Sequence, residues 1–423
     1  MRPPPARLTA LGTAAAVLLV LLWVRWVDPR DWTLADVAVY IRGGRALLEG
    51  TDLYAVTAGV LPFTYPPFAA VLFVPLALLG GTGSGVVVSL LSLLALVVLV
   101  AVSVARRTPA SDSARALAPR PELVAVGGLL FVAALTTEAV QRTLVLGQVN
   151  LVLAAVVAVD LLLLPRRWRG VLLGLAIAVK LTPAVFLGYL LLRREWAALA
   201  RGSVTVAVTV AAGWVLAPSA SATFWSGGAS SLGRFGDEAA GYGNQSLGAA
   251  LDRFAPGISD MVWLLLVVAV VALSAVATWR TQRRRDDLAA VTALAVGGLL
   301  VSPISWTHHW VWVVPVMAVL LARRWRVGLF VAFAVMYLPP MVLVAETGLD
   351  VGAAQPVVDA TWTILGVVYL VALAGWPGSG VARGPGQVEN RGAGQGGEVT
   401  GVDEHLAGAD PTADHHLTRR DHG

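Results

Sequence analysis

One carboxylate in this chain, Asp36, is placed where it could act as a general base. It lies near the start of the segment 33–54, in which apolar residues recur at three- and four-residue spacing. The spacing predicts a short amphipathic helix on a membrane surface that ends at Gly50. Partial desolvation at such a boundary raises the pKa of a carboxyl group toward the range in which it can take a proton from a hydroxyl. The structural alternative is a capping box with Thr33. The spaced residues are Val37, Tyr40, Ile41, Gly44, Leu47 and Leu48.

Three basic side chains could bind an anionic group beside such a base. Lys180, the only lysine, interrupts the apolar segment 170–192 close to Pro183. Because a charge inside a membrane segment is costly, we predict that Lys180 binds a phosphate; a lysine that snorkels to the interface is the alternative. His308 and His309 follow a Ser-Pro pair between two apolar segments. We predict that they belong to the same site, with a satisfied pair at the interface as the alternative.

Further polar and aromatic side chains lie near the predicted outer ends of the apolar segments. Arg142, Gln148 and Asn150 could contact a sugar or a phosphate, although capping and packing of helix ends explain them as well. Tyr65 belongs to the stretch 61–68, which two prolines make rigid and extended. Its ring suits a sugar or an isoprenoid chain, and an aromatic belt at the interface is the alternative. A base beside cations is what transfer of a group to a hydroxyl needs when the leaving group is an anion.

The elements that must position these residues are membrane helices. Of the 423 residues, 57% are hydrophobic and only 13% are charged, and the mean hydropathy is +0.74, more apolar surface than a soluble core needs. We predict an all-α polytopic membrane protein with about 10–12 transmembrane or half-membrane helices, since each full crossing takes about 20 apolar residues. The apolar segments are 8–24, which we interpret as a retained first span, 68–79, 86–105, 123–135, 149–164, 170–192, 202–217, 261–278, 288–304, 310–322, 327–345 and 357–375.

Arginine clusters orient the predicted helices, because cytoplasmic loops gather Arg and Lys. The segments between the clusters are then outside, and they include a first external loop, 28–67, and a large external loop, 218–260. This orientation requires the Pro75-containing segment 68–79 to cross only halfway. The clusters begin at Arg106, Arg166, Arg193, Arg280 and Arg323.

The segment 170–192 carries basic clusters at both ends, so it cannot be one crossing with its ends on opposite sides. We predict two short helices that meet at residues 180–183, because proline cannot continue the hydrogen-bond ladder of the first helix.

Several function classes are excluded by the sequence. The chain has no cysteine, so it has no thiolate nucleophile or cysteine-ligated metal, and it has no phosphate-binding loop or dinucleotide fingerprint. Its positive charges lie in short clusters between apolar segments, which favours oriented membrane loops over a nucleic-acid surface. Residues 1–376 are predicted to form the membrane domain. The Gly-rich polar residues 377–423 are predicted to be a disordered cytoplasmic tail whose histidines are solvated.

A series of motifs resembles a known family over residues 30–345. The chain is similar to the actinobacterial polyprenol-phosphate-mannose-dependent α-(1→2)-mannosyltransferases, which form glycosyltransferase family 87 of the GT-C class. The most specific motifs are the Tyr-Pro-Pro element and the Ser-Pro element followed by the histidine pair. The matching series is Asp36-x3-Tyr40, Gly50-x2-Leu53-Tyr54, Thr64-Tyr65-Pro66-Pro67-Phe68, Gly147-Gln148-Val149-Asn150, Lys180-x2-Pro183, Asn244-Gln245-Ser246 and Ser302-Pro303-Ile304-Ser305-Trp306-x-His308-His309.

The resemblance implies a GT-C-like bundle and an inverting transfer on the outer face of the cell membrane. The implied donor is polyprenyl-phosphate-mannose, the acceptor is a glycolipid or lipoglycan, and the base is an acid of the first external loop, which maps onto Asp36. Other GT-C families carry two adjacent acids there, whereas Asp28, Asp31 and Asp36 are spread out here. The lipid-linked sugar is a substrate, so no cofactor is expected, and no metal ligand is assigned. The residues predicted to bind the donor are Tyr65, Arg142, Gln148, Asn150, Lys180, Asn244, His308 and His309.

Two other functions compete with the enzyme. A transporter or flippase of lipid-linked sugars would use Lys180 to line a pathway, but such proteins place their binding sites near the membrane midplane, and the long external loops favour the enzyme. A membrane scaffold gives no reason for the polar residues to gather on one face.

Overall fold

The computed structural model of the chain describes residues 32–55, 61–106, 121–227 and 239–375, together with residues 12, 16, 19 and 20. Apart from those four residues, the predicted first span, 8–24, lies outside the described residues, and so does the predicted tail, 377–423. Asp28 and Asp31 lie outside them too.

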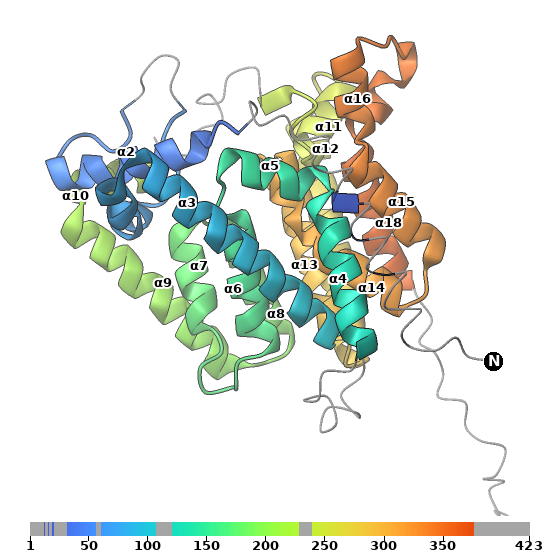
Figure 1. Cartoon of the computed structure of the whole chain (residues 1–423), viewed down its shortest axis with the longest axis horizontal. Helices are drawn as coiled ribbons and strands as arrows, with labels where there is room; N and C mark the ends of the chain where they lie inside the picture. Colours follow the sequence, from blue (N-terminus) through green and yellow to red (C-terminus); the bar gives the residue numbers. More distant parts are fainter. Residues whose placement is uncertain are drawn as a thin grey trace, which may run out of the picture. The chain divides into compact units, whose positions relative to one another are not determined.

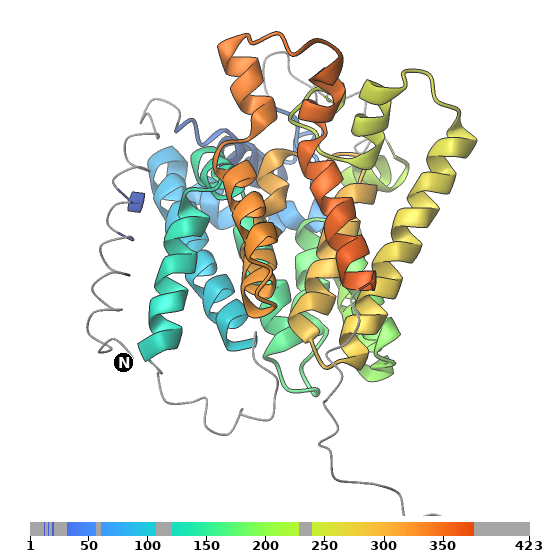
Figure 2. The same cartoon turned by 90° about the vertical axis from the view of Figure 1, so that its right-hand side faces the viewer.

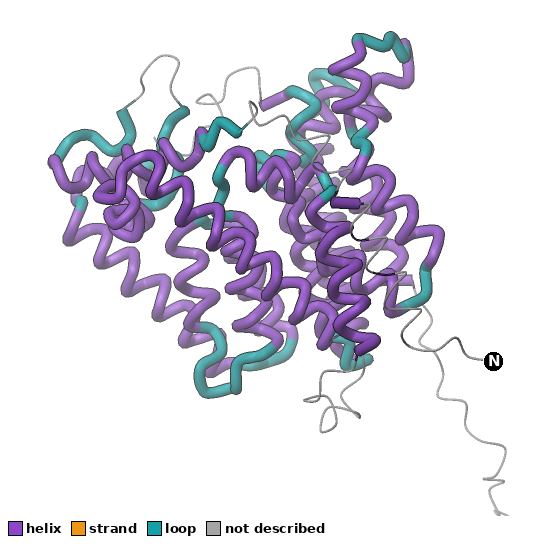
Figure 3. Tube along the Cα trace, viewed as in Figure 1, coloured by secondary structure: helices purple, strands orange, loops and turns teal. Residues whose placement is uncertain are grey.

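Helices dominate the described residues, which contain no strand and only an isolated bridge between Asn244 and Trp306 (Figure 3). The predicted all-α class is confirmed. The helices are α2 (Ala35–Glu49), α3 (Pro67–Arg106), α4 (Pro121–Leu135), α5 (Glu138–Leu146), α6 (Asn150–Leu162), α7 (Val171–Val179), η3 (Thr182–Phe186), α8 (Leu187–Leu192), α9 (Trp196–Leu216), α10 (Pro218–Trp225), α11 (Leu247–Phe254), α12 (Asp260–Arg283), α13 (Asp287–Val301), η5 (Thr307–Trp312), α14 (Val313–Ala322), α15 (Arg326–Tyr337), α16 (Pro340–Thr347), η6 (Gly352–Ala354), α17 (Gln355–Asp359) and α18 (Thr361–Gly375).

Among the described residues, four helices are long and apolar enough to cross a membrane: α3, α9, α12 and the continuous stretch Arg326–Thr347 that contains α15 and α16. The number rises to six if two bent pairs, α4 with α5 and η6–α17 with α18, each form one span. Shorter apolar helices of 10–17 residues, such as α6 and α13, lie among them. Leucine and valine side chains remain exposed along α3, α9 and α12, as lipid-facing surfaces require. The chain is an all-α polytopic membrane protein.

The predicted amphipathic helix of the first external loop is present as α2. It buries Val37, Val39, Tyr40 and Ile41 against α3, and Gly50 ends it in the left-handed conformation. The capping box is wrong, because the N-cap is Leu34 and no side chain caps the helix. The start of the helix is held instead by a main-chain hydrogen bond of 3.0 Å from Leu34 to the Val145 carbonyl.

The segments predicted at 68–79 and 86–105 are one helix, α3, with a break at Gly80. Gly80 has φ 73° and ψ 178°, a conformation that essentially only glycine adopts. The first part of α3 packs against α2, and the later part runs down the bundle toward the end of α4 (Figure 1). That the segment 68–79 crosses only halfway stays a prediction.

The predicted break in segment 170–192 is confirmed. α7 ends at Val179, Lys180 is extended with φ −149° and ψ 134°, and a short 3-10 helix that contains Pro183 leads into α8. The main-chain carbonyls of an interrupted helix must find other partners, so such a break is stable only inside a protein or beside a cavity.

The arginine-rich loops lie at one end of the membrane domain, and α2, α5, α11 and α16 lie at the opposite end (Figures 1 and 2). We call these the arginine end and the α2 end. Ion pairs fasten the arginine end: Arg169 and Arg193 both bind Glu195 at 2.9 Å, and Arg323 binds Asp286 at 2.7 Å. The predicted grouping of the arginine clusters on one side is confirmed for the described residues.

Candidate active site

Asp36 sits where α2 meets the turn between α5 and α6. Gly147 makes this approach possible, because it has φ +69° and because a Cβ atom there would lie 2.3 Å from a methyl carbon of Val37. The first turn of α2 therefore rests directly on the turn that contains Gln148, and the Asp36 side chain hydrogen-bonds with the Gln148 side chain.

Two tyrosine hydroxyls orient the Gln148 amide. Tyr40 Oη donates to Gln148 Oε1 at 3.2 Å, and Tyr65 Oη donates to the same oxygen at 3.4 Å. Tyr40 Oη also accepts a hydrogen bond of 3.2 Å from the Val149 main-chain nitrogen, so its own proton is free for Gln148. Burial raises the pKa of both tyrosines, which therefore stay protonated donors. Since Gln148 Oε1 is occupied by donors, the amide NH2 group is the part that can donate to Asp36.

Asp36 has the electrostatics of a base. Burial raises the pKa of its carboxyl from 3.8 to about 6, against the hydrogen bond from Gln148 and the positive charge of Lys180, which both lower it. A carboxyl group with a pKa near the working pH is both deprotonated and basic enough to accept a proton in a transition state.

Lys180 faces a polar cluster built from three distant segments. Its Nζ atom donates to Asn150 Oδ1 at 3.0 Å and lies 3.1 Å from His309 Nε2. Among the described residues, the ion pairs within 4.0 Å involve Arg169, Arg193 and Arg323 but not Lys180. The Lys180 ammonium group is partly buried beside neutral hydrogen-bond partners, and a bound anion would balance its charge.

The two histidines have different surroundings. The imidazole of His309 contacts Lys180, whereas the main-chain carbonyl of His308 accepts hydrogen bonds from Asn150 Nδ2 at 3.0 Å and from Thr143 Oγ1 at 3.1 Å. The two rings are perpendicular, with centroids 4.7 Å apart. His309 therefore presents its ring to the site, and the main chain of His308 ties η5 to α5 and α6.

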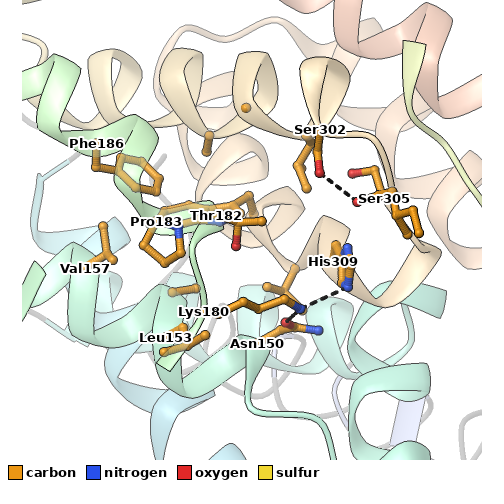
Figure 4. Close-up of a pocket in the computed structure, with 17 residues that line it drawn as sticks. Asn150, Leu153, Val157, Lys180, Thr182, Pro183, Phe186, Ser302, Ser305 and His309 are labelled. Carbon is orange, nitrogen blue, oxygen red and sulfur yellow. Dashed lines mark hydrogen bonds between the residues drawn. The ribbon is translucent and has the colours of Figure 1, made fainter. Parts of the chain in front are cut away.

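A pocket with about 540 Å³ of empty space, its open mouth included, adjoins this cluster. Lys180, Asn150 and His309 line it together with Ser302 and Ser305, and the side chains converge from α6, η3, η5 and the end of α13 (Figure 4). Lys180 thus lines the pocket, and its charge also acts on the Asp36 carboxylate. This arrangement can deprotonate a hydroxyl at Asp36 and bind an anionic leaving group at Lys180.

Comparison with known proteins agrees with this arrangement. The profile described as glycosyltransferase family 87 matches residues 63–303, which is more than half of the chain. The chain belongs to glycosyltransferase family 87. No solved structure matches it significantly.

Relatives of this family 87 protein have names that state an activity. The chain is 37% identical over 342 residues to the polyprenol-phosphate-mannose-dependent alpha-(1-2)-phosphatidylinositol mannoside mannosyltransferase of Mycolicibacterium smegmatis, and the match covers 73% of this chain and 75% of the relative. It is 35% identical over 333 residues to a polyprenol-phosphate-mannose-dependent alpha-(1-2)-phosphatidylinositol pentamannoside mannosyltransferase of Mycobacterium tuberculosis, covering 74% and 73%. An alpha-(1->3)-arabinofuranosyltransferase of Corynebacterium glutamicum is 28% identical over 256 residues, covering 57% and 60%. These names favour an enzyme over a transporter or flippase.

Two of the predicted donor-binding residues lie apart from the cluster. Arg142 is exposed on α5, although its charge acts on His308. The amide of Asn244 is occupied by the protein: its nitrogen donates to the Ala239 and Pro303 carbonyls, and its oxygen accepts from the main chain of Ser246 and Ser305. In this family 87 chain Asn244 fastens the 244–246 turn to the Ser-Pro loop, and a direct role in sugar binding stays a prediction.

Tyr40 and Ser305 each lie within a motif of the resemblance, but the sequence assigned neither of them a role in the site. The hydrogen bond from Tyr40 to Gln148 joins residues 108 positions apart. Ser305 lies in a loop, so only the fold of the family 87 chain reveals that it lines the pocket.

Proposed function

We propose that this family 87 protein transfers mannose from polyprenyl-phosphate-mannose to a glycolipid or lipoglycan acceptor, with inversion and formation of an α-(1→2) link. The observation that carries the proposal is the pairing of a raised-pKa carboxyl, Asp36, with a cation, Lys180, whose partners in the described residues are neutral. The names of the relatives that are most similar over most of the chain supply the donor, the sugar and the linkage.

The proposed reaction is a single displacement at the anomeric carbon. Asp36 takes the proton from an acceptor hydroxyl, whose oxygen forms a bond to the anomeric carbon as the bond from that carbon to the phosphate oxygen breaks. The electron pair leaves with the polyprenyl phosphate, and Lys180 and His309 stabilise its charge. Because no covalent intermediate with the protein forms, one carboxylate suffices and the configuration inverts. The donor itself is the only other substrate that this step needs.

Transfer assays with labelled sugars test the function. Membranes that contain the protein receive polyprenyl-phosphate-mannose with a radiolabelled sugar, or in parallel a polyprenyl-phosphate-linked arabinofuranose, because one relative is named for that sugar. We expect label from the mannose donor in a new glycolipid whose mannose is released by an α-(1→2)-specific mannosidase. Transfer of arabinofuranose alone would contradict the proposed sugar. Movement of intact donor across vesicles without a new glycosidic bond would establish the transporter.

We also propose that the α2 end of the membrane domain, with the active site, faces the outside of the cytoplasmic membrane. The grouping of arginine-rich loops at the opposite end supports this orientation, since such loops stay in the cytoplasm. The chain has no native cysteine, which makes single-cysteine labelling clean. We expect a membrane-impermeant maleimide to label Arg45→Cys on α2 in intact cells, and to label Arg284→Cys after α12 only in permeabilised cells. Labelling of both positions from the same side would contradict the orientation.

A further inference from the structure

The pocket beside Lys180 has two chemically different ends. Asn150, Lys180 and His309 form its polar end together with Ser302 and Ser305 (Figure 4). Apolar side chains, among them Leu153, Val157, Phe186, Leu299 and Trp312, form the rest of its wall. Figure 4 shows Phe186 and Val157 on the side of the pocket away from Ser305 and His309. A ligand that fills this space must itself be polar at one end and apolar at the other.

The polar end contains a hydroxyl that lacks a partner. Ser305 is fully buried, and its Oγ atom has no hydrogen-bond partner among the described residues. The main chain of Ser305 is fixed on both sides, because its nitrogen donates to Asn244 Oδ1 at 2.8 Å and its carbonyl accepts from the Gln245 nitrogen at 2.8 Å. A buried hydroxyl without a partner costs about 1–3 kcal/mol, so such groups usually serve a ligand or a water molecule. The hydroxyl lines the same pocket as the unpaired cation Lys180, which favours an anionic ligand group at this end.

The apolar end lies next to a break in the helix ladder. Thr182 and Pro183, which follow this break, line the pocket, and Thr182 is exposed at its margin. Leu299 and Ser302, at the end of α13, are partly exposed on the other side. Thr182, Leu299 and Ser302 therefore mark the side on which this pocket opens.

We propose that this pocket binds the donor lipid at its junction, with the phosphate at the polar end and the first isoprene units between α6, η3 and α13. The proposal rests on the proposed function for the identity of the lipid. An isoprenoid chain would pack against the apolar wall of the pocket, and each methylene group buried there contributes about 0.8 kcal/mol to binding. The sugar, on the other side of the phosphate, then extends toward Asp36.

A second apolar groove is the competing place for the chain. It lies between the start of α3, α7, α9 and α10, and it is lined by Phe68, Leu181, Val210 and Trp225 among others. No charged side chain lines it, and Lys180 points into the first pocket instead. The observations therefore favour the first pocket, and the groove is an outcome that the experiment must detect.

A photoreactive polyprenyl phosphate tests the site without requiring sugar transfer. The probe carries a diazirine on its first isoprene unit and is added to the full-length protein in lipid nanodiscs. Val157→Phe and Leu299→Phe fill the apolar end, the latter at a partly exposed position that tolerates a larger side chain. Val156→Phe is the matched control, because Val156 lies on the same helix but does not line the pocket. Val210→Phe fills the competing groove.

We expect crosslinks on peptides from α6, η3 and α13, reduced about tenfold or more by each filling variant and unchanged by Val156→Phe and Val210→Phe. Thermal unfolding shows which variants remain folded. If Val157→Phe unfolds, the test of the pocket rests on Leu299→Phe and on the crosslink positions in the unmodified protein. Crosslinks on α9 or α10 that Val210→Phe removes would overturn the proposal, and so would undiminished crosslinking in folded filling variants. Crosslinks in the pocket together with no transfer from polyprenyl-phosphate-mannose would leave the lipid site intact and reject only the proposed function.

Discussion

Replacing Asp36 with asparagine will lower sugar transfer by about 10²- to 10⁴-fold, the usual contribution of a general base. Asparagine keeps the shape of the side chain and can still bond to Gln148, but it cannot take a proton from the acceptor hydroxyl. Binding of the donor, measured with polyprenyl phosphate, should change little. The measurement is kcat/KM for transfer from the labelled donor, with the amount of folded protein determined by size-exclusion chromatography.

The pH dependence of the unmodified enzyme is part of the same expectation. Burial raises the pKa of the Asp36 carboxyl to about 6, and the group works only when deprotonated. Thus kcat/KM should be flat above this pH and fall about tenfold per pH unit below it. The residual activity of Asp36→Asn should lack this acid limb, because the titrating group is gone.

Asp52→Asn provides the matched control for Asp36→Asn. Asp52 lies in the same external segment, where its carboxylate accepts a hydrogen bond of 2.9 Å from the Tyr54 main chain, and asparagine can accept the same bond. We expect normal turnover in this variant. Near-normal turnover in Asp36→Asn would contradict the assignment and direct attention to Asp31 or Asp28.

Much of the fold that positions Asp36 could be predicted from periodicity and breakers. The apolar spacing of α2, its end at Gly50 and the interruption of segment 170–192 are local features that the sequence contains in full. The cap of α2 could not be predicted, because the helix start is held by the main chain of a distant residue, Val145. At α3 the charge pattern predicted that the Pro75-containing segment crosses only halfway, but it did not indicate a break: Pro75 fits inside the helix, and the break is at Gly80.

The members of the site could be predicted one at a time, but their partners could not. Lys180, Asn150 and His309 each stood out as polar groups at apolar segments, yet hydrogen bonds over 30 and 129 positions join them. No periodicity encodes such contacts, since they arise from how α6, η3 and η5 pack. The resemblance to family 87 named these residues without indicating that Gln148 is oriented by tyrosines or that Ser305 is left without a partner.

Replacing Lys180 with methionine will weaken use of the lipid-phosphate donor by roughly 2–5 kcal/mol, the usual loss when one partner of a desolvated charge pair is removed. This equals a decrease in kcat/KM of about 30- to 4000-fold, at 1.4 kcal/mol per tenfold. Methionine keeps the length of the apolar stem, so the wall of the pocket is preserved while the charge is removed. Loss of that charge also removes an effect that lowers the pKa of Asp36, so the acid limb of the pH profile should move to higher pH.

The two histidines serve as a comparison for Lys180→Met. His309→Ala removes a ring that lies 3.1 Å from Lys180 Nζ, so it should weaken donor use in the same direction. His308→Ala should do so less, because the hydrogen bonds that His308 makes to Asn150 and Thr143 use its main-chain carbonyl, which alanine retains. A structural role for Lys180 alone would instead lower thermal stability and leave donor use by the folded protein unchanged. If the lysine variant and both histidine variants used the donor with unchanged kinetics, the phosphate would have to bind elsewhere, and the pocket lined by Lys180 would lose its place in the reaction.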